Sequence, residues 1–265
     1  MNPTVEVLPM TAPCRRVAPL APLVWLRRGW DDMRAAPCES LFYGALLFFL
    51  SVAIVVGAWR LGLIALYLGL ASGFVFIGPF LAIGLYSISY QRQAGRQPTI
   101  AYSLREGSAH LRDTLVLGIC LLVILLVWGR AATIMNVFRP VSATPRPGDL
   151  IPFLGIGSVV GAIFAGIVFA ATAFSLPMLL DRRADAITAV VTSINATLRN
   201  KRAMLVWGAL IFAAVVIGFA TMLLGFIVLM PLIGYATWHA YRDTIDASAW
   251  PPTHDATDLA ASDAS

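Results

Sequence analysis

Long stretches without a charged side chain constrain the fold of this sequence more than any other feature. Residues 40–59, 61–91, 150–180 and 203–241 contain no Asp, Glu, Lys or Arg. A transmembrane helix needs about 20 apolar residues to cross a hydrocarbon core of about 30 Å. Only 12% of all residues are charged, against about 25% in soluble domains. The sequence therefore predicts an all-α, polytopic membrane protein.

Six membrane-spanning helices are predicted from these stretches and from another that follows Asp113. As one helix, residues 203–241 would measure about 58 Å, nearly two bilayer cores. We therefore divide them by a tight turn near residues 222–225, with one kinked helix as the alternative. The spans are expected at residues 41–59, 63–89, 114–134, 152–179, 203–222 and 224–241.

The basic residues orient the chain. With a cytoplasmic N-terminus, 15 of the 19 Lys and Arg residues fall on the cytoplasmic side, as the positive-inside rule requires. Six spans then place both termini in the cytoplasm, and we expect a multi-pass protein of a bacterial inner membrane. The membrane domain should cover residues 20–245. An N-terminal arm (1–19) and a C-terminal tail (246–265) are predicted to be disordered, the tail because it has little apolar surface.

An internal repeat is visible in the apolar segments. Residues 43–48 (YGALLF) return as residues 207–212 (WGALIF), and a Gly-Phe pair, a proline and an aromatic residue recur at equal spacing in the second and sixth spans. These are Gly73, Phe74, Pro79 and Tyr86 in one span and Gly225, Phe226, Pro231 and Trp238 in the other. Pro177 lies near the end of the fourth span. We therefore predict three hairpins, each with one proline in its second helix.

Amphipathic segments precede the hairpins. Before the first, Trp25, Leu26, Gly29, Trp30 and Met33 share one helical face, and Arg27, Arg28, Asp31, Asp32 and Arg34 share the other. Before the third, an apolar stripe ends in a basic cluster; its members are Ile187, Val190, Val191, Ile194 and Leu198, followed by Arg199, Lys201 and Arg202. The segment after Pro98 is a poorer example. Such helices lie in the cytoplasmic membrane interface, and ordinary polar loops are the alternative.

Aromatic residues near the ends of these segments are candidate interfacial anchors, since Trp and Tyr favour headgroup depth. They are Trp25, Trp30, Trp238 and Tyr241, together with His239.

Four segments carry a resemblance to a known family. They are residues 25–32 (WLRRGWDD), 78–86 (GPFLAIGLY), 175–179 (SLPML) and 238–242 (WHAYR). Over residues 20–245 the chain resembles a family of predicted bacterial integral membrane proteins catalogued as a domain of unknown function. Some members carry a cytochrome c oxidase subunit label. The resemblance implies a polytopic inner-membrane protein, and it implies no substrate, cofactor or catalytic residue.

The residue types argue against that oxidase label. Haem and copper centres in a membrane need several histidine ligands, and the chain has only His110, His239 and His254. The three cysteines show no CxxC spacing. We expect no metal, no cofactor and no enzymatic activity, because no Ser-His-Asp or phosphate-loop pattern is present. The basic clusters flank apolar segments, which indicates anionic lipid headgroups rather than nucleic acid.

Small residues are candidates for close helix packing, either within one chain or between copies in a homo-oligomer. They are Gly69 and Gly73 in the second span and Gly157, Gly161 and Gly166 in the fourth. The prolines are candidates for helix kinks, because each leaves a carbonyl about one turn earlier without its hydrogen bond. Interrupted helices also occur at binding sites of transporters.

Two functions therefore stay open. The first is a non-catalytic protein that binds lipids, or a membrane-protein partner, through its basic cytoplasmic face. The second is a channel or transporter for an uncharged or amphiphilic solute that passes along the helices of Pro79, Pro177 and Pro231. The second function predicts a hydrated cavity lined by the second, fourth and sixth spans.

Overall fold

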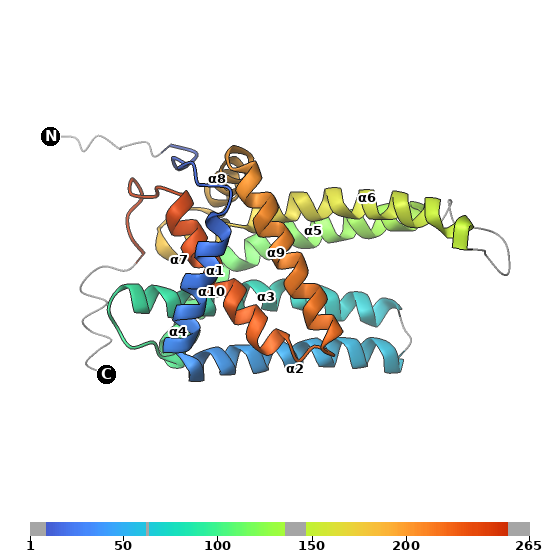
Figure 1. Ribbon diagram of the computed structural model, residues 1–265, viewed down its shortest axis with the longest axis horizontal. Helices are drawn as coiled ribbons and strands as arrows, with labels where there is room; N and C mark the ends of the chain where they lie inside the picture. Colours follow the sequence, from blue (N-terminus) through green and yellow to red (C-terminus); the bar gives the residue numbers. More distant parts are fainter. Residues whose placement is uncertain (1–8, 62–63, 136–146, 254–265) are drawn as a thin grey trace.

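The computed structural model describes residues 9–61, 64–135 and 147–253 of the chain (Figure 1). Within these ranges the chain forms ten α-helices and no β-strand. They are α1 (Ala21–Ala35), α2 (Pro37–Leu61), α3 (Ile64–Gln93), α4 (Ile100–Ala109), α5 (Leu111–Met135), α6 (Pro147–Thr172), α7 (Ser175–Asp181), α8 (Ala186–Arg199), α9 (Lys201–Ala220) and α10 (Phe226–Thr244). A shorter helix precedes two longer ones three times, and α7 is a separate piece after α6.

Among the described residues, four helical segments are long and apolar enough to cross a membrane. They are Pro37–Gly57, Leu111–Ala131, Gly155–Asp181 and Lys201–Ala220. Between 17% and 28% of each apolar window is buried, so most of this surface faces outward, as contact with lipid requires. Helices α3 and α10 are not among these four, and the six-span count stays a prediction.

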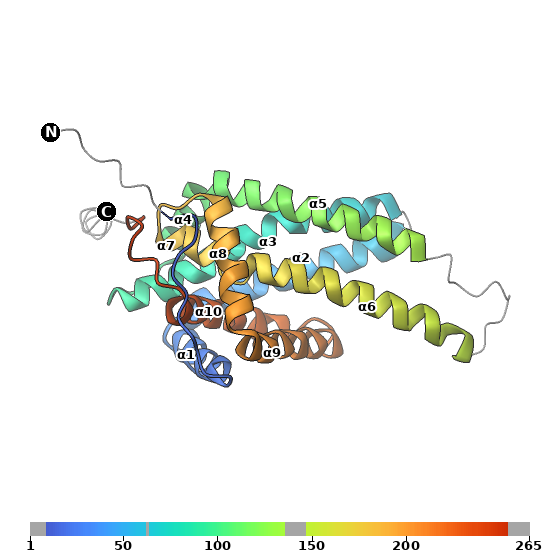
Figure 2. The same ribbon diagram turned by 90° about the horizontal axis from the view of Figure 1, so that it is seen from above.

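The long helices form antiparallel pairs. Figures 1 and 2 show α2 beside α3 and α5 beside α6, and the helices of each pair are in contact. Helices α1, α4, α7 and α8 gather at one end of these pairs. The largest core cluster lies at this end and combines buried side chains from α1, α3 and α7 through α10.

The turn between α9 and α10 falls where the sequence predicts it. Helix α9 ends at Ala220 and α10 begins at Phe226, and Met222 and Leu223 adopt φ angles of 53° and 71°. The backbone N–H of Gly225 donates to Thr221 Oγ1 at 2.8 Å. A single kinked helix over residues 203–241 is therefore wrong.

The three prolines interrupt their helices differently. Pro79 and Pro231 lie inside α3 and α10. Pro177 lies in α7, and the helical run breaks four residues earlier, between the end of α6 at Thr172 and the start of α7 at Ser175. The carbonyl of Ile227, one turn before Pro231, lies against Gly44 of α2, where a Cβ would overlap it. The freed carbonyl of α10 is thus a site of close helix packing.

The terminal segments are packed against each other. Arg15 N donates to Thr244 O at 2.7 Å, and Asp246 N donates to Pro13 O at 2.9 Å. Ala12 and Trp250 are buried in the core. The prediction of disorder is therefore wrong for residues 9–19 and 246–253, because a few apolar side chains suffice where an existing core receives them. Residues 1–8 and 254–265 lie outside the described residues.

Candidate functional site

Helix α8 begins at a well-formed cap. The Asp185 carboxylate accepts hydrogen bonds from Thr188 N at 2.9 Å and from Thr188 Oγ1 at 2.7 Å. These two bonds hold the pKa of Asp185 below its usual value. Because an aspartate at this position satisfies first-turn N–H groups, the start of α8 is fixed by local sequence.

Helix α8 buries small and hydroxylated side chains instead of its large apolar ones. Thr192 Oγ1 accepts from Ala12 N at 3.0 Å, which ties the N-terminal segment to the helix. Ser193 Oγ accepts from Phe174 N at 3.1 Å and donates to Ala170 O at 2.7 Å, which satisfies the backbone at the α6–α7 break. The inner face of α8 is therefore a polar joint that holds two other segments.

The opposite face of α8 is apolar and uncovered. The exposed fractions are 69% for Ile187, 38% for Val191, 36% for Ile194 and 56% for Leu198. These four residues form the exposed stripe of α8. Figure 2 shows that α8 lies across α5 and α6 near one end. A helix that crosses the long helices and exposes an apolar stripe has the geometry of an interfacial helix.

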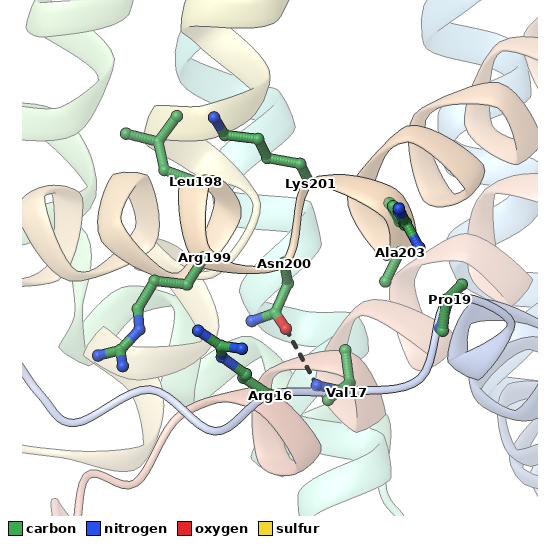
Figure 3. A pocket seen from close by; sticks show the side chains of 9 residues that line it. Arg16, Val17, Pro19, Leu198, Arg199, Asn200, Lys201 and Ala203 are labelled. Carbon is green, nitrogen blue, oxygen red and sulfur yellow. Dashed lines mark hydrogen bonds between the residues drawn. The ribbon is translucent and has the colours of Figure 1, made fainter.

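A pocket of about 260 Å³ opens where α8 ends and α9 begins. Asn200, between the two helices, fixes its shape: Asn200 Oδ1 accepts from Val17 N at 3.0 Å, and Nδ2 donates to Arg15 O at 3.0 Å and to Ala196 O at 3.1 Å. These bonds hold the N-terminal segment against the junction (Figure 3). That segment thereby becomes one wall of the pocket.

The lining of this junction pocket is strongly basic. Four of its nine residues are cationic and none is acidic; the cations are Arg16, Arg199, Lys201 and Arg202. Within the described ranges, none of the four forms an ion pair with an Asp or Glu side chain. In Figure 3, Arg16 and Arg199 project to one side of the junction, and Lys201 and Leu198 project to the other. The lining residues therefore give the pocket a positive potential.

Two other polar clusters are fully satisfied inside the fold. Asp32 of α1 is buried, and its carboxylate contacts Ser89 Oγ at 2.6 Å, His239 Nε2 at 2.8 Å and Arg92 Nη1 at 3.0 Å. Because the carboxylate lies between the serine and the histidine, His239 does not contact Ser89 as a catalytic base must. The cluster ties α1, α3 and α10 together.

The second cluster centres on buried Asp181, at the end of α7. Tyr241 Oη donates to its carboxylate at 2.7 Å, Arg182 Nε at 3.0 Å and Arg242 Nη1 at 3.2 Å. The Asp181 carbonyl also accepts from Thr253 N at 3.1 Å. The cluster thus joins α7, α10 and the C-terminal segment. Sequence reasoning placed no acidic residue inside the fold and missed both clusters.

The predicted interfacial anchors are mostly core residues. Trp25, Trp238, His239 and Tyr241 are buried within the protein. The Trp25 ring packs edge-on against Trp207 with centroids 5.9 Å apart, and its Nε1 donates to Asp243 Oδ2 at 3.0 Å. Contact with lipid headgroups is therefore wrong for these four. Trp30 is 38% exposed and is the anchor candidate whose side chain reaches the surface.

An apolar groove of about 450 Å³ lies between α3, α5 and α6. Pro79 and Gly161 line it with Trp128, whereas Pro177 and Pro231 do not. It differs from the hydrated cavity predicted for transport, because its lining is apolar and comes from α5 instead of α10.

The candidate packing glycines of α6 face open space in the single chain. A Cβ added at Gly157, Gly161 or Gly166 would meet no atom within 4 Å. The surroundings of Gly69 and Gly73 lie outside what the structure describes. Packing through the α6 glycines therefore stays a prediction that needs a second molecule.

Residues 66–181, which run from α3 through α7, match the model of a family described as "Predicted integral membrane protein (DUF2189)". The protein is an integral membrane protein. This match confirms the resemblance to membrane proteins of unknown function over residues 66–181, which include the motifs at 78–86 and 175–179. No curated protein and no solved structure was found to match the chain.

Proposed function

We propose that this integral membrane protein is a non-catalytic protein that binds anionic lipid through its basic cytoplasmic face. The observation that carries the proposal is the inverted burial of α8. The helix covers its small polar side chains with protein and leaves the exposed stripe of α8 uncovered. A membrane surface suits such a helix, because apolar side chains enter the acyl boundary while neighbouring cations meet the headgroups.

The charges next to the exposed stripe of α8 also support contact with an anionic membrane surface. The exposed stripe of α8 ends at Leu198, and the next residue is Arg199, which lines the junction pocket. A basic residue near an anionic leaflet contributes about 1 kcal/mol of attraction. Apolar contact and headgroup attraction thus act at adjacent places on one helix.

The proposed topology has six spans in three hairpin repeats, with both termini on the cytoplasmic side of a bacterial inner membrane. The order of one shorter and two longer helices, found three times, supports the repeat. The hydrogen bonds between residues 13–15 and 244–246 support termini on one side, because they hold both ends of the described chain together. A cytoplasmic N-terminus places 15 of the 19 Lys and Arg residues on that side, which supports a cytoplasmic assignment.

The depth of α8 tests the proposal. In a background with the three native cysteines changed to Ser, a fluorophore is attached at Ile187→Cys or, as a matched exposed control, at Ser248→Cys. Proteoliposomes contain lipids with brominated acyl chains, which quench a fluorophore only by contact. We expect strong quenching at position 187 that increases when phosphatidylglycerol replaces part of the phosphatidylcholine, and little at 248. Equal quenching at the two positions would overturn the proposal.

Transport of an amphiphilic solute is the second candidate, and the apolar groove beside Pro79 favours it. The groove has room for part of an acyl chain or a similar apolar group. Solute flux into proteoliposomes tests this candidate. Uptake that Pro79→Ala or Pro231→Ala abolishes would support transport and replace the lipid-binding proposal, and absence of uptake would exclude it for the solute tested.

A further inference from the structure

We propose that the junction pocket between α8 and α9 is a binding site for the phosphate group of an anionic phospholipid. This inference rests on the proposed function and assigns it to named residues. The groups proposed to contact the phosphate are the guanidinium groups of Arg16 and Arg199. Lys201 and Arg202 add to the positive potential of the pocket.

Asn200 holds the N-terminal segment instead of capping α9. An asparagine before a helix ordinarily accepts a hydrogen bond from a first-turn N–H group. Here Asn200 makes no such bond to α9, because its side chain holds Val17, Arg15 and Ala196 instead. The first N–H groups of α9 therefore lack a side-chain cap next to the pocket, where an anion is favoured.

The pocket also pairs two arginines. The bonds of Asn200 to the N-terminal segment bring Arg16 to the same side of the junction as Arg199 (Figure 3). Two guanidinium groups repel each other, and no described acidic side chain forms an ion pair with either of them. A phosphate relieves this repulsion and accepts paired hydrogen bonds from the planar guanidinium groups.

Exposed apolar side chains lie in and near the pocket. Leu198, the last residue of the exposed stripe of α8, is part of the lining and projects with Lys201 on the side opposite Arg16 and Arg199 (Figure 3). Leu205, about one turn after Lys201 in α9, is 74% exposed. A soluble phosphate would use the cations alone, whereas a phospholipid would also cover these two leucines with its acyl chains. The arrangement therefore favours a lipid as the source of the phosphate.

The test measures lipid affinity of the full chain. Delipidated protein in detergent is titrated with phosphatidylglycerol or phosphatidylcholine and followed by native mass spectrometry. We expect Arg16→Gln/Arg199→Gln to weaken the tightest phosphatidylglycerol binding at least tenfold, the loss typical of one charge-assisted hydrogen bond. The matched control is Arg27→Gln/Arg112→Gln, which removes two exposed cations outside the pocket and should change the affinity less than twofold.

The experiment distinguishes failure of the proposed function from failure of the pocket assignment. If the unaltered protein binds both lipids equally, the proposed function fails. If it prefers phosphatidylglycerol but the pocket variant binds as the control does, the pocket assignment alone is overturned. If glycerol phosphate displaces the lipid at a similar concentration, the ligand is a soluble phosphate and the lipid source is overturned. Should the Arg16/Arg199 variant fail to fold, Lys201→Gln/Arg202→Gln serves in its place, with a loss of at least threefold expected and unchanged affinity overturning the assignment.

Discussion

Gly44 and Gly208 hold the same place in the repeated segments YGALLF and WGALIF, but they face different surroundings. A Cβ at Gly44 would overlap the carbonyl oxygen of Ile227 and lie 2.8 Å from its carbonyl carbon and 3.0 Å from its Cα. All three atoms are backbone, so no side-chain rotation relieves the contact. A Cβ at Gly208 would meet only Phe169 Cζ, at 4.0 Å. The same substitution is therefore expected to act differently at the two positions.

We expect Gly44→Ala to destabilise the protein by about 1–3 kcal/mol, the range for overpacking of a filled interior. At about 2–4 °C per kcal/mol for a chain of this size, the unfolding midpoint should fall by about 2–12 °C. Gly208→Ala should leave the midpoint unchanged or raise it slightly, since alanine favours the helix.

The assay is thermal unfolding in detergent, followed by tryptophan fluorescence. Trp25, Trp207 and Trp238 are fully buried, so their emission reports on the core that α10 completes. The comparison of two Gly→Ala variants removes any general effect of the substitution on helices. Equal midpoints for the two variants would refute the packing of α10 against α2 that the structure describes.

Two further predictions concern single carboxylates. Asp185→Ala should cost α8 about 1 kcal/mol through the lost cap, seen as faster hydrogen exchange in its first turn. The hydrogen bonds from Thr188 hold the pKa of Asp185 below 3.8. The cap therefore stabilises α8 fully above pH 3.8, and this stabilisation is lost as the pH falls through the lower pKa of the folded state. Unchanged protection of the first turn of α8 from hydrogen exchange at pH 3 would contradict this. Asp32→Ala should destabilise the folded protein by about 3 kcal/mol, because it leaves buried donors unpaired. Asp31→Ala, on the exposed side of α1, should shift the unfolding midpoint by less than 1 °C. Equal shifts for the two variants would contradict the buried role of Asp32.

Features encoded locally could be predicted from the sequence. The turn at residues 222–225 follows from the length of an uncharged run against the thickness of a bilayer. The break before Pro177 follows from the missing N–H of proline. The exposed stripe of α8 follows from apolar residues at helical spacing, except that Val190, expected in the stripe, packs against the core. Each of these needs only residues that are close together in the chain.

Features that depend on distant segments could not be predicted in this way. The sequence places Trp238 and Tyr241 at the end of an apolar run, where an aromatic residue serves equally well as a lipid anchor or as a core residue. Contacts from α1, α3 and α7 decide the matter and bury both. The packing of residues 9–19 has the same origin, because its partners lie about 180 residues away.

The helical spacing of α1 indicates that Asp32 is buried, although its charge favours the outer face. Trp25, Gly29 and Asp32 follow the spacing i, i+4 and i+7, which places them on one side of a helix, and all three are buried. The prediction for Asp32 is wrong because it uses charge as the mark of the outer face. In a membrane protein the outer face is apolar, and a charged side chain can point inward where hydrogen-bond or ion-pair partners surround it. Helix α8 obeys the same inversion, with Thr192 and Ser193 inside and Ile187 outside. For both helices, the polar residues that share a face with small residues identify the buried side.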